Sequence, residues 1–244
     1  MSTLDAFITL NTYIISDTHL DDKKVGEFSP NRLPSTVSFD PENPTPWLTQ
    51  HNNDIIEAWN SAISATDRVF CLGDFAWRKV DQFSSKLSGK KAILLGNHDK
   101  GRQAYKLWDY VIDKPTISLS GILMEMAQVS VFNKVNSSCF VKDFDFKGKN
   151  VRIMFSHLPV FDYSNQFDPL QFVRQREILE TLFTELRCDL NVHGHIHDLS
   201  ATDNRCINVC VERIGLGPVT LRSVLERYFR NNNENDCDVD RSNV

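Results

Sequence analysis

The stretch Leu94-Leu95-Gly96-Asn97-His98-Asp99 follows the apolar pair Ala92-Ile93, and it places glycine, amide, imidazole and carboxylate groups directly after a predicted strand. Four further apolar runs end in polar clusters, namely Ser16-Asp17-Thr18-His19, Gly73-Asp74, Ser156-His157 and His193-Gly194-His195-Ile196-His197. In an open sheet with parallel strands, sites form beyond the carboxyl ends of the strands. We therefore expect the five polar clusters to meet at one site.

Strands and helices alternate along the chain. Short apolar runs predict strands at residues 11–16, 68–72, 91–95, 117–126, 129–135, 151–155, 189–192 and 207–211. Apolar residues at helical spacing predict helices at 53–65, 80–87, 170–187 and 220–229. Residues 143–150 read as a hairpin region that turns at Lys147-Gly148. This order of elements is typical of an α/β fold with partly parallel strands.

The length of 244 residues favours one domain, which we place at residues 1–230. Five prolines between residues 20 and 49 predict an irregular insertion there, which is either a lid over the site or a surface loop. The polar run after Arg230 has little to bury, so residues 231–244 are expected to form a disordered tail.

Composition excludes several classes of protein. A net charge of −5 argues against a broad basic surface that binds phosphate groups, so nucleic acid is expected only as a substrate. No stretch approaches the roughly 20 apolar residues that cross a membrane. The six cysteines are scattered without a C-x-x-C pair, which is typical of free thiols in a reducing compartment and predicts a cytoplasmic protein.

The polar clusters offer the ligands of a metal centre. Carboxylates, one amide and imidazoles, without cysteine, suit divalent Mn, Fe, Zn or Mg. The candidate ligands are Asp17, His19, Asp74, Asn97, His157, His195 and His197. Seven ligands exceed the four of one tetrahedral metal, so two metals are the more economical interpretation, with Asp74 as the bridge. Glycines 73, 96 and 194 would let the backbone turn or approach closely.

The ordered set resembles the calcineurin-like metallophosphoesterases. That family carries D-x-H, G-D, G-N-H-D or G-N-H-E, a lone H and G-H-x-H, matched here in order between residues 17 and 197. The resemblance implies a four-layer α/β/β/α sandwich. It also implies that one metal is bound by Asp17, His19 and His197 and the other by Asn97, His157 and His195, with Asp74 shared.

The same resemblance implies a reaction: hydrolysis of a phosphomonoester or phosphodiester by a metal-bridging hydroxide. His98 would stabilise charge or protonate the leaving oxygen, and Asp99 would orient its ring. A non-catalytic metal-binding module on the same fold and a nuclease are the alternatives. The presence of His98 disfavours the non-catalytic module. The net negative charge gives no support to a nuclease.

Three residues outside the ligand set, Arg78, His193 and His51, have interpretations of their own. Arg78 lies four residues after Asp74, as in the G-D-x-x-D-R-G motif of protein Ser/Thr phosphatases, which makes it a candidate phosphate contact. Trp77 and Lys79 depart from that motif, so the general phosphoesterase branch is favoured over the protein phosphatases. His193 is interpreted as a strand residue supporting the site, and His51 as a surface residue.

Overall fold

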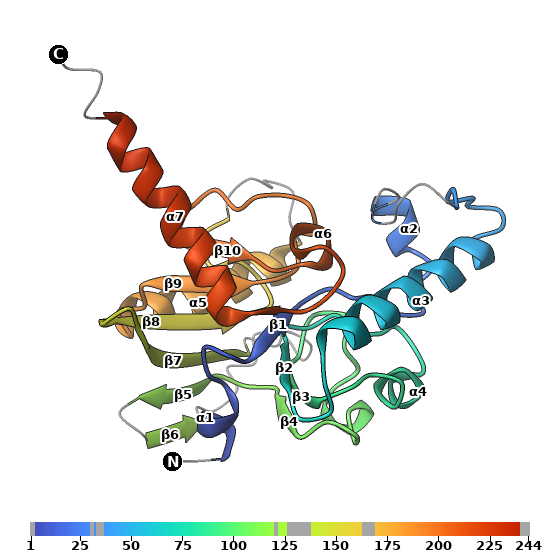
Figure 1. Ribbon diagram of the computed structural model, residues 1–244, viewed down its shortest axis with the longest axis horizontal. Helices are drawn as coiled ribbons and strands as arrows, with labels where there is room; N and C mark the ends of the chain where they lie inside the picture. The colour runs from blue at the N-terminus through green and yellow to red at the C-terminus, as the bar shows by residue number, and fades with distance from the viewer. Residues whose placement is uncertain are drawn as a thin grey trace.

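Two β-sheets lie face to face with helices on their outer sides in the computed structural model (Figure 1). The structure describes residues 3–29, 32, 37–119, 122–125, 138–162 and 169–239. Within these residues the first sheet has the order β11-β1-β2-β3-β4. Its strands are β1 (Tyr13–Ile15), β2 (Arg68–Cys71), β3 (Lys90–Leu94), β4 (Tyr110–Ile112) and β11 (Val219–Thr220). Strands β1 to β4 are parallel, and β11 pairs antiparallel with β1.

The second sheet has the order β10-β9-β8-β7-β5-β6 among the described residues. Its strands are β5 (Thr116–Leu119), β6 (Ile122–Glu125), β7 (Cys139–Phe146), β8 (Lys149–Ser156), β9 (Leu190–His193) and β10 (Cys206–Asn208). The β7–β8 hairpin turns at Lys147 and Gly148, both with positive φ, as the sequence predicted. Strands β8, β9 and β10 run parallel, so their polar ends share one edge.

Alternate residues of each central strand enter different cores, because successive side chains point to opposite faces of a sheet. Phe70 of β2 and Phe155 of β8 belong to the core between the sheets. Val69 of β2 packs instead with Ile55 and Trp59 of α3 (Thr45–Ala62) and with α4 (Val80–Ser84). On the other side, Met154 packs with α5 (Leu170–Glu185). The predicted four-layer α/β/β/α sandwich is therefore confirmed.

Helix α3 shows where the sequence prediction of the insertion was wrong. It begins at Thr45 and not near residue 53, because Pro46 stands in its first turn, where a missing N–H costs no hydrogen bond. A short helix, α2 (Val25–Phe28), also lies within the insertion. The remaining short helices are α1 (Thr3–Phe7), α6 (Val211–Ile214) and the 3₁₀-helix η2 (Arg102–Ala104). The predicted strand at 129–135 lies outside the described residues.

The last helix, α7 (Leu221–Val239), is longer than predicted. Its first turns are anchored by the buried side chains of Leu221 and Leu225, and its C-terminal half extends away from the sheets (Figure 1). Residues 231–239, which the sequence assigned to a disordered tail, continue the helix because no Gly or Pro interrupts it. Residues 240–244 lie outside the described part of the chain. No described helix is long and apolar enough to cross a membrane.

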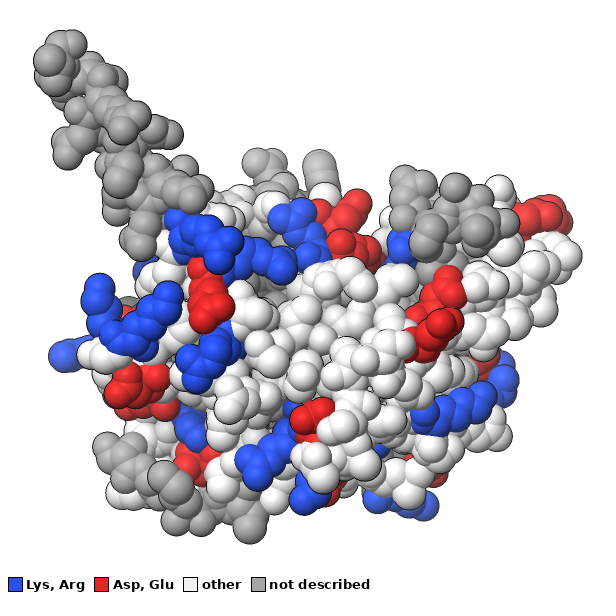
Figure 2. All heavy atoms as spheres, viewed as in Figure 1, with Lys and Arg blue, Asp and Glu red and all other residues white. Residues whose placement is uncertain are grey.

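The face of the molecule that Figure 2 shows carries charged side chains of both signs. On the side shown in Figure 2, basic and acidic side chains are interspersed around a large uncharged area. Five cysteines are free thiols, as the spacing predicted, namely Cys71, Cys139, Cys188, Cys206 and Cys210.

Candidate metal centre

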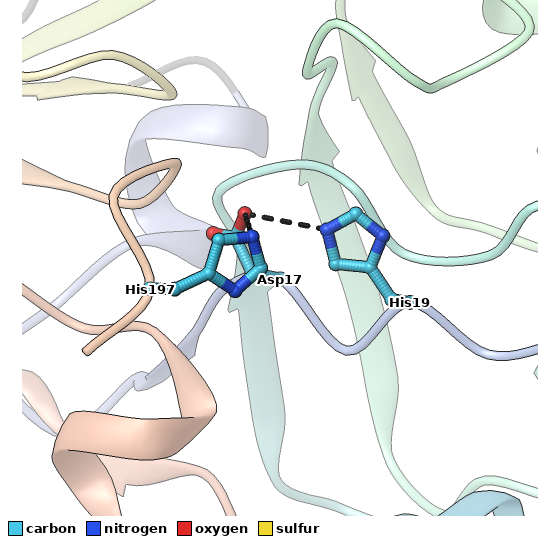
Figure 3. Close-up of side chains that lie close together, drawn as sticks. All are labelled: Asp17, His19 and His197. Atoms are coloured by element: carbon cyan, nitrogen blue, oxygen red, sulfur yellow. Dashed lines mark ion pairs between the residues drawn. The ribbon is translucent and has the colours of Figure 1, made fainter. Parts of the chain in front are cut away.

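The first cluster of candidate ligands joins the end of β1 to the loop after β9. Asp17 and His19 follow β1, and His197 follows β9. The Oδ1 atom of Asp17 lies 3.7 Å from Nε2 of His19 and 4.0 Å from Nε2 of His197. Figure 3 shows the Asp17 carboxylate turned toward both imidazole rings. Three possible ligand atoms from two distant segments of the chain thus lie close enough together to bind one ion.

Two atoms of this cluster are buried without a hydrogen-bond partner. They are Oδ1 of Asp17 and Nε2 of His19, on side chains that are 0% and 3% exposed. An unpartnered buried polar atom costs about 1–3 kcal/mol, so a protein seldom keeps two of them facing each other. A divalent cation between them would satisfy both, and the residues present therefore fit a metal ion.

The second cluster consists of Asp74 after β2, His157 after β8 and His195 after β9. The Oδ2 atom of Asp74 lies 3.3 Å from Nε2 of His157. The same Nε2 atom lies 2.9 Å from Oδ1 of Asn97, which follows β3. The rings of His157 and His195 are 5.1 Å apart in an edge-to-face contact. Three candidate ligands from separate motifs, Asn97, His157 and His195, thus meet beside the carboxylate of Asp74.

Asp74 lies between the two clusters. Its Oδ2 atom is 3.7 Å from Nε2 of His19 in the first cluster and 3.3 Å from Nε2 of His157 in the second. Asp74 is 2% exposed. A single carboxylate therefore lies between the two groups of candidate ligands, and its bridging of two cations stays a prediction.

The backbone at these positions is unusual. Asp17, His19, Asp74, His195 and His197 all have φ between 46° and 71°, the left-handed region that side chains with a Cβ rarely adopt. Each such residue costs of order 1 kcal/mol or more, and such residues cluster at functional sites. The strand ends therefore turn sharply so that their side chains face a common centre.

Two glycines permit the close approach of these turns. A Cβ on Gly73, whose φ is +103°, would lie 2.6 Å from the backbone nitrogen of Gly96 and 2.8 Å from Nδ1 of His157. A Cβ on Gly194 would overlap Oγ of Ser16 and Oδ2 of Asp17. The predicted role of these glycines in close packing agrees with the geometry.

Neighbouring carboxylates and imidazoles shift one another's pKa values within the centre. Burial lowers the pKa of His19 and His157, but neighbouring carboxylates outweigh it and raise these pKa values to about 9 and about 10. Burial raises the pKa of Asp74, but the charge of His157 outweighs it, so the pKa falls. Burial and the charge of His157 lower the pKa of His195 to about 3. A bound cation would replace the imidazole protons, because a metal ligand must be neutral imidazole.

Carboxylates outside the two clusters orient their histidines, and the sequence analysis did not find them. Nδ1 of His19 lies 3.0 Å from Oδ2 of Asp22, and Nδ1 of His197 lies 2.8 Å from Oε1 of Glu212. A carboxylate accepts only, so Nδ1 carries the proton and Nε2 is free for a ligand bond. The spacing His19-x-x-Asp22 was a local signal for the first pair; Glu212 has no comparable signal.

Asp99 does not have the predicted role. Its carboxylate accepts hydrogen bonds from the backbone N–H groups of Asp74, Phe75 and Gly96 and from the hydroxyl of Tyr105, which account for its described partners. The prediction that Asp99 aims the ring of His98 is therefore corrected. Asp99 ties the turn after β2 to the turn after β3, and so holds Asp74 in place.

His98 lies at the opening of the centre. Its side chain is 42% exposed, and its Nε2 atom lies 3.9 Å from Oδ2 of Asp74. Its backbone N–H donates to Oδ1 of Asp74 at 2.8 Å. Arg78 is exposed in the loop between β2 and α4, and no described contact joins it to the two clusters.

The two remaining histidines are both buried. His193 ends β9, and its Nδ1 atom lies 2.8 Å from the carbonyl oxygen of Gly194, as a supporting strand residue should. His51, which was expected on the surface, is 0% exposed. Its ring stacks on that of Trp47 with the centroids 5.0 Å apart, and its Nε2 atom lies 3.1 Å from Nη1 of Arg32. That prediction was wrong because the start of α3 was placed too late along the chain.

Known proteins resemble this chain in sequence or in fold. An uncharacterised protein of Methanocaldococcus jannaschii, MJ1445, is 27% identical over 103 residues, which cover 40% of this chain and 52% of the relative. The chain thus spans about half the length of that relative. The crystal structure of AQ665 from Aquifex aeolicus, a protein of unknown function, shares the fold, with a TM-score of 0.60, 24% identity and coverage of 88% of this chain and 97% of that one. The sequence profile of the calcineurin-like phosphoesterases matches residues 10–199, and the chain therefore belongs to the calcineurin-like phosphoesterase family.

Proposed function

We propose that the protein hydrolyses a phosphoester with the help of two divalent cations. The observation that carries the proposal is the position of Asp74, whose Oδ2 atom faces His19 at 3.7 Å and His157 at 3.3 Å. Carboxylates that serve two cations in this way are typical of sites for phosphoryl chemistry. Membership of the phosphoesterase family supports the same reaction class.

In this proposal each cluster holds one cation. Asp17, His19 and His197 bind the first, and Asn97, His157 and His195 bind the second. Asp22 and Glu212 keep the Nε2 atoms of His19 and His197 free for the first cation, and the carbonyl of Leu72, 2.9 Å from Nδ1 of His157, does the same for the second. Oxygen and nitrogen donors without thiolate favour Mn, Fe, Zn or Mg, with Mn suited to a first assay.

Cations at this centre supply Lewis acidity, which lowers the pKa of water and offsets the charge of a phosphate group. The protein groups supply position and exclusion of water. The side chains of Asp17, His19 and His157 are at most 3% exposed, so their ligand atoms lie at the buried base of the site. His98 lies on the solvent-exposed side of the site, and its Nε2 atom can donate a proton to the leaving oxygen of the ester.

The test uses the purified full chain with Mn, Fe, Zn or Mg and a panel of p-nitrophenyl phosphate mono- and diesters. The wild type is expected to turn over at least one ester only when metal is present. Asp74→Asn should lose both metals together in elemental analysis, and Asp81→Asn, which removes one exposed carboxylate from α4, should lose neither.

Two results would contradict the proposal. Binding of metals without hydrolysis of any ester would indicate a non-catalytic metal-binding module on this fold. Loss of only one metal from Asp74→Asn would show that another group serves both cations.

A further inference from the structure

A short segment after β10 joins the carboxyl ends of β1 and β9. The N–H of Val209 donates to the carbonyl oxygen of His193, the last residue of β9, at 2.9 Å. The carbonyl oxygen of Val209 accepts the N–H of Ser16, which directly follows β1, at 3.1 Å. Ser16 and Cys210 then form a parallel β-bridge. Cys210 is therefore fixed beside the end of β1, where Asp17 begins the first cluster.

The thiol of Cys210 contacts the carboxylate of Asp17. Its Sγ atom lies 3.2 Å from Oδ2 of Asp17, and both residues are 0% exposed. An ionised carboxylate only accepts hydrogen bonds, so the thiol is the donor in this pair. The same Oδ2 atom accepts the N–H of His195 at 2.8 Å. Two donors from separate segments of the chain thus hold one oxygen of the carboxylate.

The other oxygen of Asp17 has no hydrogen-bond partner among the described residues. This atom, Oδ1, is buried and lies 3.7 Å from Nε2 of His19 and 4.0 Å from Nε2 of His197 (Figure 3). Rotation of the carboxylate would exchange its two oxygens, and donors on Oδ2 oppose that rotation. The two oxygens therefore have separate roles, because one is bonded to the protein and the other faces the two imidazoles.

We propose that Cys210 is a positioning residue of the metal centre, whose thiol holds Oδ2 of Asp17 so that Oδ1 faces the first cation. This inference rests on the phosphoesterase function proposed above, because that function places a cation at the first cluster. A carboxylate that is already ordered loses less freedom when the cation binds. Removal of the donor at residue 210 should therefore weaken binding of the first cation.

Two other roles for this thiol can be distinguished from positioning. As a metal ligand it would need to face the cation, but Sγ contacts Oδ2, and within the described chain it is not among the atoms grouped closely enough to hold one ion. A buried cysteine can also act as a small hydrophobic residue, as Cys139 does where β7 packs against α5. A packing role depends on the volume of the side chain, whereas a positioning role depends on its proton donor.

The binding test compares substitutions at residue 210 in the full chain. Cys210→Ser keeps a donor in a smaller side chain, Cys210→Val keeps the volume without a donor, and Cys210→Ala lacks both. In isothermal titration with Mn²⁺, Cys210→Val and Cys210→Ala should weaken one of the two binding steps about tenfold, as expected for the loss of one hydrogen bond to a charged group. Cys210→Ser should stay within about threefold of the wild type, because a hydroxyl is also a donor. Cys139→Ser and Cys139→Val are the controls and should leave both steps unchanged.

The hydrogen bond itself can be observed without turnover. Infrared difference spectra between the wild type and Cys210→Ser isolate the S–H stretching band of this thiol, and a hydrogen bond to a carboxylate lowers its frequency. We expect the Cys210 band at a lower frequency than the Cys139 band, which the difference between the wild type and Cys139→Ser gives. Saturation with Mn²⁺ should leave the Cys210 band in place, because only a thiol that became a metal ligand would lose its proton.

The outcomes separate this inference from the proposed function. Equal Mn²⁺ affinities in all variants, or tighter binding by Cys210→Val than by Cys210→Ser, would overturn the positioning role and leave ester hydrolysis by the wild type intact. A Cys210 band at the frequency of Cys139, or its loss on addition of Mn²⁺, would also overturn that role. Absence of ester hydrolysis by a wild type that binds Mn²⁺, with the expected order of variants, would overturn the phosphoesterase function and leave the role of Cys210 in place. A wild type that binds none of Mn, Fe, Zn or Mg would overturn both.

Discussion

Arg32 and Glu212, which are 180 residues apart in the sequence, form a buried ion pair in which Nε of Arg32 lies 2.9 Å from Oε1 of Glu212. The same oxygen lies 2.8 Å from Nδ1 of His197. Arg32 also donates from Nη1 to the carbonyl oxygen of Thr18 at 3.3 Å. One side chain of the insertion therefore supports both segments that form the first cluster.

Removal of Arg32 should affect folding and the first cluster together. Arg32→Ala leaves the buried Glu212 carboxylate without its guanidinium partner and with the N–H of His197 only, and breaking a buried pair in this way costs about 3–5 kcal/mol. The free energy of unfolding, measured with urea, is expected to fall by that amount, and the affinity for one of the two metals should fall with it. Arg102→Ala breaks an exposed pair with Asp113 and should cost less than about 1 kcal/mol. Equal effects of the two substitutions would show that the Arg32 pair has no special role.

The corrected role of Asp99 leads to a distinct prediction. Asp99→Asn turns an NH₂ group toward one of the backbone N–H donors, so the free energy of unfolding should fall by about 1–3 kcal/mol, and metal content should fall because Asp74 loses its support. His98→Asn should lower turnover with both metals retained. Metal analysis and urea unfolding of both variants check this. If Asp99→Asn kept full stability and both metals and lost only turnover, Asp99 would act through His98 after all.

Local sequence was enough to predict which polar segments meet at one place. Asp17, Asp74 and His157 follow the ends of buried strands within a few residues, so the topology of the sheets decides where they meet. The four layers were implied by the family resemblance, and the alternation of Val69 and Phe70, which enter different cores, agrees with them. In such cases the information lies within a few residues of the site.

Long-range contacts were not predictable in this way. Arg32 and Glu212 come from an irregular loop and a four-residue helix, and no pattern in either segment identifies its partner. The family resemblance assigned Asp99 to the ring of His98, which is its neighbour in the sequence. The strand ends turn so sharply that the carboxylate reaches the backbone of the adjacent loop instead.

His51 should make stability depend on pH. Burial, and then the charge of Arg32, lower its pKa from 6.5 to about 3 in the folded protein. Between these values the unfolded chain binds one proton more at His51, so the free energy of unfolding falls as pH falls, by about 1.4 kcal/mol per pH unit. Above pH 7 this contribution is constant. His51→Gln should remove that slope, measured as the difference between the two proteins in urea unfolding from pH 4 to pH 8. Parallel curves would mean that His51 is not the group involved.

The packing of Gly194 against Asp17 offers the most direct test of the site geometry. A methyl group at residue 194 would overlap Oγ of Ser16 and Oδ2 of Asp17, and Oδ2 is the atom that accepts the N–H of His195 at 2.8 Å. Gly194→Ala must therefore displace the Asp17 carboxylate from the first cluster.

We expect Gly194→Ala to fold but to lose the metal bound by Asp17, His19 and His197, as elemental analysis and metal titration would show. The control is Gly148→Ala, where φ is +76° and no atom lies within 4 Å of the added carbon. It should cost about 1 kcal/mol of stability through backbone strain and leave both metals bound. If Gly194→Ala retained both metals with wild-type affinity, Asp17 would not be a ligand in the position that the structure gives it.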